Sequence, residues 1–191
     1  MPVAWTFKRA KVTKPENSSV EKEDRERMCT SGGVEAGKVI VNMKDLETAK
    51  RVIAERQLTL SVVKEGRVIF ESKTHGVSGF MEAIEEFRGR LDGASVADRV
   101  VGKAIALLCV YAKARAVYAA TISNAAKALL EESSVYLEWD SLVENILSAD
   151  KLKTCPFEQL VDRITDPADA YRKLKSACGS ATRFIPADEN V

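Results

Sequence analysis

Residues 94–112 read ASVADRVVGKAIALLCVYA and contain two apolar segments separated by a short polar one. The first segment, Ala94 to Ala97, has the length and composition of a short strand. The second segment, Val100 to Ala112, is apolar on nearly every side, which predicts a helix that is buried all round. A strand that leads directly into a buried helix is typical of an α/β sheet.

Towards the N-terminus, the hydrophobic pattern predicts a helix, a β-hairpin and a second helix. Asp45 can cap the first helix, and Glu65-Gly66 is a tight turn between two short apolar runs. The expected elements are a helix over 45–56, strands over 58–63 and 68–70, a loop over 73–79 and a helix over 80–87.

Towards the C-terminus, strands and helices continue to alternate before a helical end. Ser123 is placed to cap a helix, and Gly179 is a helix stop signal. The expected elements are strands over 116–121 and 135–137, a helix over 124–130 between them, and final helices over 142–147, 156–164 and 167–177. Strands joined through helices predict a three-layer α/β/α architecture in one domain.

The composition fits one globular domain with a loose segment at each end. The chain has 191 residues, of which 46% are hydrophobic and 30% are charged, so wholesale disorder is excluded. Residues 1–36 lack sustained apolar periodicity and predict a solvated N-terminal extension. We therefore expect an α/β domain over 37–181 and a loose tail over 182–191.

Charge and cysteine usage exclude several classes of protein. Lys and Arg number 29 and Asp and Glu 28, and this balance of +1 argues against a nucleic-acid or lipid-surface protein. The longest apolar run, 104–112, is about half of what a bilayer needs, so we expect no membrane span. No C-x-x-C pair and no signal-peptide stretch occur, which predicts a reducing, cytoplasmic compartment.

The polar residues after the 94–97 strand are candidates for ligand binding. In open α/β sheets ligands bind beyond the carboxyl ends of strands, where helix N-terminal amides can hold an anion. Asp98, Arg99, Gly102 and Lys103 stand at that position. The stretch is not a phosphate loop, because Ala104 replaces the Ser or Thr that would hold magnesium. The structural alternative is a capping Asp98, a Gly102 that permits close packing and a Lys103 whose amine reaches water.

Two further motifs carry side chains of chemically reactive types. Cys155 and Glu158 begin the predicted helix at 156, where a helix N-terminus lowers a thiol pKa; Cys155 would be a nucleophile or redox thiol and Glu158 a capping or proton-relay group. His75 and Gly76 lie on the loop before the helix at 80, where an imidazole could contact a ligand. The structural alternatives are a helix start that merely contains a cysteine and an ordinary loop histidine. Cys109 is expected to be an inert core residue.

Several segments carry a family resemblance: LSVVKEG at 60–66, Gly76, DRVVGKA at 98–104, Ser123, CPFE at 155–158 and DPADAY at 166–171. In these segments the chain resembles an uncharacterised family of the cytidine deaminase-like superfamily. The resemblance implies a deaminase-like α/β/α fold, with a mixed sheet of about five strands that opens with a hairpin, helices on both faces and extra C-terminal helices. It also implies self-association into a homo-oligomer.

The zinc ligands of that superfamily are missing. Active zinc deaminases place a His or Cys and a Glu after the hairpin, and two cysteines after the third strand. Here these places read GVSGFME at 76–82 and ADRVVG at 97–102, and His75 with Glu82 does not have the H-x-E spacing. Zinc needs three or four such ligands, so we expect no metal, no cofactor and no zinc-dependent deamination.

The expected function is therefore that of a deaminase-fold protein without zinc that binds a small anionic or nucleotide-like molecule. Asp98, Arg99 and Lys103 would orient the ligand, with His75 and Ser123 at the rim of the pocket. The alternative is a non-catalytic protein-interaction module with a vestigial pocket. A divergent metal-dependent deaminase ranks third.

Overall fold

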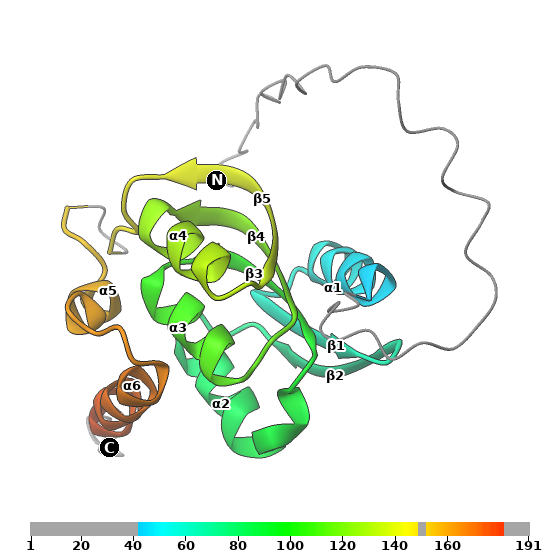
Figure 1. Cartoon of the computed structure of the whole chain (residues 1–191), viewed down its shortest axis with the longest axis horizontal. Helices are drawn as coiled ribbons and strands as arrows, with labels where there is room; N and C mark the ends of the chain where they lie inside the picture. The colour runs from blue at the N-terminus through cyan, green and yellow to red at the C-terminus, as the bar shows by residue number, and fades with distance from the viewer. Residues whose placement is uncertain (1–41, 149–151, 182–191) are drawn as a thin grey trace, which may run out of the picture. The chain divides into compact units, whose positions relative to one another are not determined.

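A computed structural model describes residues 42–148 and 152–181, and the predicted extension at 1–36 and tail at 182–191 lie outside these residues. The strands are β1 (Leu60–Lys64), β2 (Arg67–Ser72), β3 (Ser95–Val101), β4 (Ala116–Ser123) and β5 (Tyr136–Val143). They form one sheet in the order β2-β1-β3-β4-β5 (Figure 1). β1 pairs antiparallel with both β2 and β3, whereas β3, β4 and β5 are parallel. The predicted mixed sheet that opens with a hairpin is confirmed.

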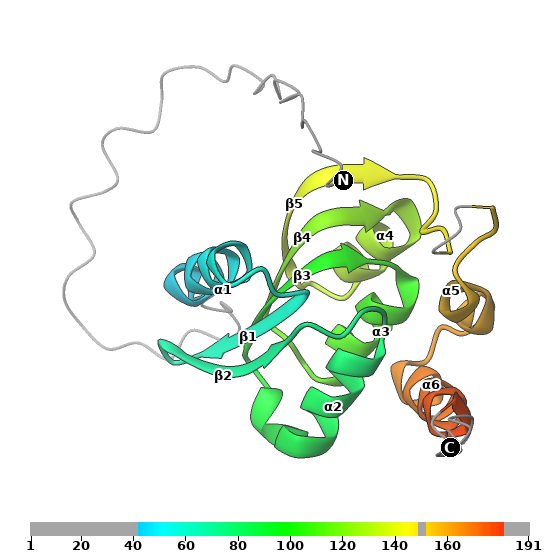
Figure 2. The same ribbon diagram turned by 180° about the vertical axis from the view of Figure 1, so that it is seen from behind.

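The helices cover both faces of this sheet. They are α1 (Met43–Glu55), α2 (Ser78–Phe87), the 3-10 helix η1 (Arg88–Leu91), α3 (Lys103–Tyr111), α4 (Asn124–Glu132), α5 (Pro156–Val161) and α6 (Pro167–Ala181). α1 lies on one face, and α2, α3 and α4 lie on the other (Figures 1 and 2). α5 and α6 pack against α3 outside these layers. The three-layer α/β/α architecture with extra C-terminal helices is therefore as predicted.

The core has two parts, one on each side of the sheet. The larger cluster lies between the sheet and the layer of α2, α3 and α4, and α3 is buried along residues 104–109. The smaller cluster joins Ala49, Val52 and Ile53 of α1 to Val63 and Ala97 of the sheet. The burial of residues 104–109 confirms the prediction of a buried helix, whereas Tyr111 in the last turn is 37% exposed.

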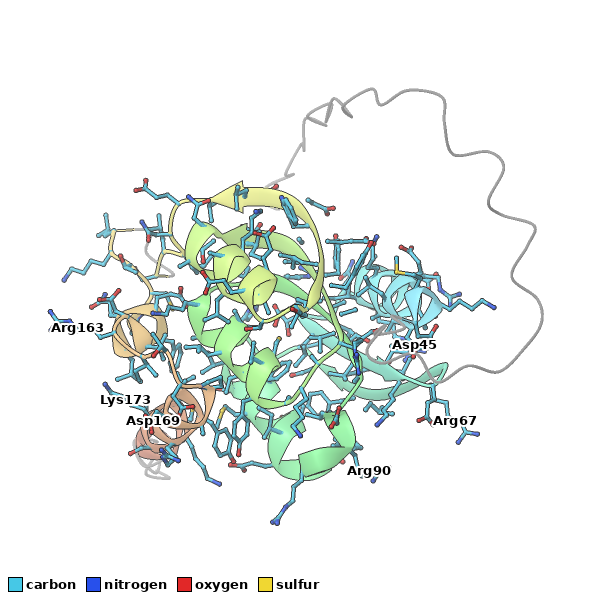
Figure 3. The ribbon with its side chains drawn as sticks, in the orientation of Figure 1. Asp45, Arg67, Arg90, Arg163, Asp169 and Lys173 are labelled. Atoms are coloured by element: carbon cyan, nitrogen blue, oxygen red, sulfur yellow. The ribbon has the colours of Figure 1, made fainter. Side chains whose placement is uncertain are left out.

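Asp45 has a different role from the predicted one. α1 begins at Met43, with Asn42 as its N-cap, so Asp45 lies inside the first turn. Its carboxylate is buried and accepts the backbone N–H groups of Glu65 and Gly66 at 2.9 and 2.8 Å. Asp45 thus ties α1 to the turn between β1 and β2 (Figure 3). An aspartate near the start of a helix has the same sequence pattern whether it caps that helix or bonds a distant turn. The predicted cap by Asp45 was wrong for this reason.

Three element boundaries also differ from the prediction. β3 continues to Val101 because it stays paired with β4, so Asp98 and Arg99 are strand residues and the helix starts later, at Lys103. The predicted helix at 142–147 is wrong, since β5 remains paired with β4 as far as Val143. α6 runs through Gly179 to Ala181, which corrects the predicted stop.

Candidate functional site

A pocket of about 630 Å³ lies beyond the carboxyl end of β3, at the N-terminal end of α3. Its walls come from the end of β3, the loop at 74–77, the first residues of α3, the segment 146–148 and the start of α5. This is the position at which open α/β sheets bind ligands. The structure gathers there these predicted site residues: His75, Gly76, Asp98, Arg99, Gly102, Cys155 and Glu158.

Asp98 is the buried carboxyl group of this pocket. It is only 7% exposed, and its Oδ1 accepts the backbone N–H of Val100 at 2.9 Å. Burial raises the pKa of Asp98 from 3.8 to about 7, although the backbone hydrogen bonds from Val100 and Arg99 oppose that change. Asp98 can therefore donate or accept a proton near neutral pH, and a carboxyl group with such a raised pKa in a pocket is a candidate functional group.

Glu158 occupies the N-terminus of α3. Its Oε2 accepts the backbone N–H of Lys103 at 2.8 Å, and its Oε1 accepts that of Ala104 at 2.9 Å. The sequence predicted that Glu158 would cap its own helix, α5, but its carboxylate caps α3 instead. Two helix N-terminal amides and the positive end of the helix dipole hold a carboxylate well. The place expected to receive an anionic ligand is thus filled by a side chain of the protein itself.

Gly102 makes this contact between α5 and α3 sterically feasible. A Cβ atom built on Gly102 would lie 2.5 Å from Glu158 Cδ and 2.8 Å from Glu158 Oε2. No side chain larger than hydrogen fits between them without moving the carboxylate. The predicted role of Gly102 in close packing is therefore supported, and the packing partner is Glu158.

Lys103 and Ser123 lie away from the pocket walls. The Lys103 Nζ donates to the backbone oxygen of Asp162, and its side chain borders a smaller neighbouring cavity of about 310 Å³. Ser123 is 1% exposed, and its hydroxyl accepts the N–H of Ala126 at 3.2 Å at the start of α4. The predicted cap by Ser123 is confirmed, whereas its place in the structure is inside the α4 junction and not at the pocket rim.

The mouth of the pocket carries the exposed groups. His75 and Arg99 are exposed and line it, and Gly76 has a φ of +74°, in the region that favours glycine. Thr59 holds this loop, because its Oγ1 lies 2.9 Å from the backbone oxygens of both Ser72 and Thr74 and shares its one hydroxyl hydrogen between them. The loop that carries His75 is thereby fixed to the start of β1.

Cys155 lies at the pocket and Cys109 in the core, and of these two positions the sequence predicted that of Cys109. Cys155 is the N-cap of α5, is partly exposed and lines the pocket. Cys109 is fully buried in α3, and burial together with the charge of Asp98 raises the pKa of its thiol. A thiol that does not ionise is unreactive, so Cys155 is the cysteine available for chemistry in the pocket.

The residues of this site do not fit the zinc ion of the active superfamily enzymes. Within residues 42–148 and 152–181, no three His, Cys, Asp or Glu side chains gather in a way that could hold a metal. At the start of α3, where those enzymes place two cysteines, the helix amides are bonded to Glu158. No step through a metal follows from this arrangement.

Sequence reasoning missed some walls of the pocket. Ile146 and Leu147 line it from the segment after β5, which the apolar pattern had assigned to a helix. Phe157 also lines it, and its ring carbon would lie 3.5 Å from a Cβ at Gly76. These residues meet the pocket only through tertiary packing. The CPFE motif was the one signal that pointed to any of them.

The fold and the site define an α/β protein with a pocket at the strand-to-helix junction. The chain belongs to the DUF1893 (TM1506) family, because the model of that family, described as a domain of unknown function, matches residues 48–177. The crystal structure of a DUF1893 family protein (TM1506) from Thermotoga maritima is 30% identical, with a TM-score of 0.68. That match covers 78% of this chain and 99% of the other.

A second solved structure is a more distant match. Acinetobacter baumannii RibD is 16% identical with a TM-score of 0.39, over 51% of this chain and 35% of that chain. No curated protein matches the chain. Among the described residues, no helix is both long and apolar enough to cross a membrane.

Proposed function

We propose that the pocket at the N-terminus of α3 binds a small nucleotide-like molecule and that Asp98 recognises the polar edge of its ring. The observation that carries the proposal is a buried carboxyl group, at a ligand-binding position of the fold, whose pKa is raised to about 7. A protonated carboxyl can donate one hydrogen bond and accept another, which matches the edge of a nucleobase.

The walls of the pocket suit a planar ring. Val100, Ile105 and Phe157 line it with apolar surface, so a ring can be buried there while its edge meets Asp98. The anionic part of the ligand cannot use the α3 amides, because Glu158 already accepts their hydrogen bonds. Arg99 and His75, exposed at the mouth, are the groups that would bind it.

The proposal agrees with the sequence resemblance to the cytidine deaminase-like superfamily and needs no metal. A chemical step in this pocket would use Asp98 as the acid or base, because its carboxyl exchanges a proton near neutral pH. Cys155 lines the same pocket and would serve as the nucleophile or redox thiol. These are the assignments to test once a ligand is known.

The experiment is a titration of the full chain with a panel of nucleoside 5′-monophosphates by calorimetry, together with native mass spectrometry of the protein as purified. We expect saturable one-site binding for at least one member of the panel, and at least a tenfold loss of affinity in Asp98→Ala, which removes both the donor and the acceptor. Asp140→Ala is the matched control, since Asp140 lies on β5 and accepts a hydrogen bond from Tyr118. No retained molecule together with no saturable binding, or equal binding by both variants, would contradict the proposal.

A second candidate function is a protein-interaction module, and the exposed edge strand favours it. In the described residues β5 is paired on one side only, and Trp139 and Leu142 on it are 38% and 48% exposed. An unpaired strand edge is a template for pairing with another chain. Analytical ultracentrifugation of the wild type and of Leu142→Lys tests whether a second copy binds there. A monomer at every concentration would remove self-association through this edge.

A further inference from the structure

A second cavity, of about 640 Å³, lies at the opposite end of α3 from the pocket described above. Its walls come from the end of α2, from η1, from the last turn of α3 and from α6. Figures 1 and 2 both show α2, α3 and α6 beside one another at this end of the domain. The cavity shares none of its lining residues with the pocket at the N-terminus of α3.

An aromatic stack forms one wall of this cavity. The rings of Tyr111 and Tyr171 are parallel within 7°, with centroids 4.4 Å apart. Tyr111 is 37% exposed, so the stack is open to solvent on its side. A planar ring that enters the cavity can extend this stack, which is a favourable arrangement for aromatic groups.

Within the described part of the chain, the charged residues of the cavity leave one cation, Arg88, unpaired and a second, Lys113, only loosely paired. Lys175 is 2.9 Å from Glu85, and Lys113 lies at a looser 3.7 Å from Asp92. Arg88 lines the cavity and makes no ion pair with any described residue. The three basic and two acidic side chains give the cavity a net positive charge, and the unpaired group is a guanidinium, which binds oxyanions in a forked geometry.

Both available cations stand in backbone conformations that favour glycine. Arg88 follows α2 with a φ of 42° and a ψ of −128°, and Lys113 follows α3 with a φ of 56°. Glycine would occupy either position at lower conformational cost. Other non-glycine residues, Gln57 among them, also have a positive φ, so this strain supports a functional role only together with the cavity. Here both strained side chains are cations that line the same cavity.

We propose that this cavity binds a small phosphorylated aromatic compound. Its ring would extend the Tyr111–Tyr171 stack, and its phosphate would lie between Arg88 and Lys113. Among the described residues Arg88 is unpaired and Lys113 is held only loosely by Asp92, so both can contact the phosphate of a monoester, which carries more charge than a carboxylate. This site is independent of the proposed function, because it uses different residues at the other end of α3.

The test uses phenyl phosphate, which contains only the two proposed features, followed by NMR of the ¹⁵N-labelled full chain. We expect saturable shifts of the amides of Arg88, Tyr111 and Lys113, and at least tenfold weaker binding of inorganic phosphate and of benzoate. The proposal is overturned if phenyl phosphate does not saturate, if inorganic phosphate or benzoate binds as tightly, or if the shifts cluster at the N-terminus of α3.

Arg88→Gly separates a binding role from a structural one. The substitution removes the cation and relieves the positive φ, so we expect the melting temperature to rise by a few °C while the affinity for phenyl phosphate falls at least tenfold. Gln57→Gly is the matched control: Gln57 has a φ of 52° after α1, so this variant should gain stability and bind normally. Unchanged affinity in Arg88→Gly would show that the side chain serves no ligand.

Gly89→Leu tests the cavity itself. A Cβ on Gly89 meets no atom within 4 Å, so a leucine fits there without strain and projects into the open space of the cavity. We expect a folded protein with at least a tenfold loss of phenyl phosphate affinity. Full binding by a folded Gly89→Leu protein would contradict the assigned position of the ligand.

Discussion

The two ends of α3 differ in how their polar groups are satisfied. At the N-terminal end, the amides of Lys103 and Ala104 bond a carboxylate that the chain itself supplies from α5. At the C-terminal end, Arg88 and Lys113 are exposed and lie beside an open aromatic stack. The same helix therefore has one end that is closed by a tertiary contact and one end where exposed cations border an open cavity.

A helix N-terminus that follows a strand of an α/β sheet is therefore not always free to bind a ligand. The amides of α3 stand where a ligand is expected from topology, yet they are occupied by Glu158. The proposed recognition in the adjoining pocket would then depend on Asp98, whose carboxyl is buried and whose pKa is raised to about 7.

The largest expected effect is the pH dependence that Asp98 gives to stability. Its pKa is 3.8 ordinarily and about 7 in the folded protein, so the folded state holds the proton more tightly. The stabilisation is complete below about pH 4 and is lost as the pH rises through 7. At about 1.4 kcal/mol per pKa unit, the loss approaches 4 kcal/mol.

Denaturant unfolding of the wild type and of Asp98→Asn between pH 4 and 9 measures this loss. Asparagine does not titrate, so the free energy of unfolding of the variant should rise relative to that of the wild type as the pH increases, and the difference should level off above about pH 8. A difference that stays constant across this range would mean that Asp98 has an ordinary pKa.

The next effect is that of Gly102→Ala on the contact between α5 and α3. The new methyl group would overlap the Glu158 carboxylate, which must then leave the amides of Lys103 and Ala104. We expect a loss of about 2–3 kcal/mol in the free energy of unfolding, measured with denaturant.

The double variant Gly102→Ala/Glu158→Ala supplies the control. Once the carboxylate is absent, the methyl group has nothing to displace, so the double variant should be about as stable as Glu158→Ala alone. Additive losses would mean that Gly102 matters for some other reason than its contact with Glu158.

The smallest expected effect on stability is that of removing the N-cap of α4, which Ser123 supplies. Ser123→Ala removes the hydroxyl that accepts the N–H of Ala126, and we expect a loss of about 1 kcal/mol. Thermal unfolding compares this variant with Glu158→Ala. If Ser123→Ala lowers the stability more than Glu158→Ala does, the Glu158 carboxylate does not fasten α5 to α3.

The layers and strands of the fold could be predicted from local patterns, whereas the contacts between elements could not. The all-apolar sequence at 104–112 correctly indicated a buried helix, and the alternation around 65–66 a hairpin. Asp45 and Glu158 were both read as local caps, but each carboxylate bonds amides distant in sequence. Sequence spacing shows that a carboxylate is able to cap an element. It does not show which element supplies the amides that the carboxylate bonds.

The sequence pointed to several residues of the candidate site, but two of those that it named, Lys103 and Ser123, lie away from the pocket. The junction after β3 and the CPFE motif do meet at one pocket. The length of β3 was underestimated, since a strand continues while its neighbours pair with it, and that information is not local. For the same reason the burial of Asp98 could not be derived from its neighbours in the sequence.

The most direct test of the central claim is a titration of the Asp98 carboxyl carbon by ¹³C NMR in the full chain. The account predicts a midpoint near pH 7, and a shift of that midpoint when a ligand fills the pocket. A midpoint near pH 4 would contradict it, because Asp98 would then be an ordinary ionised carboxylate without the property on which the proposed function rests.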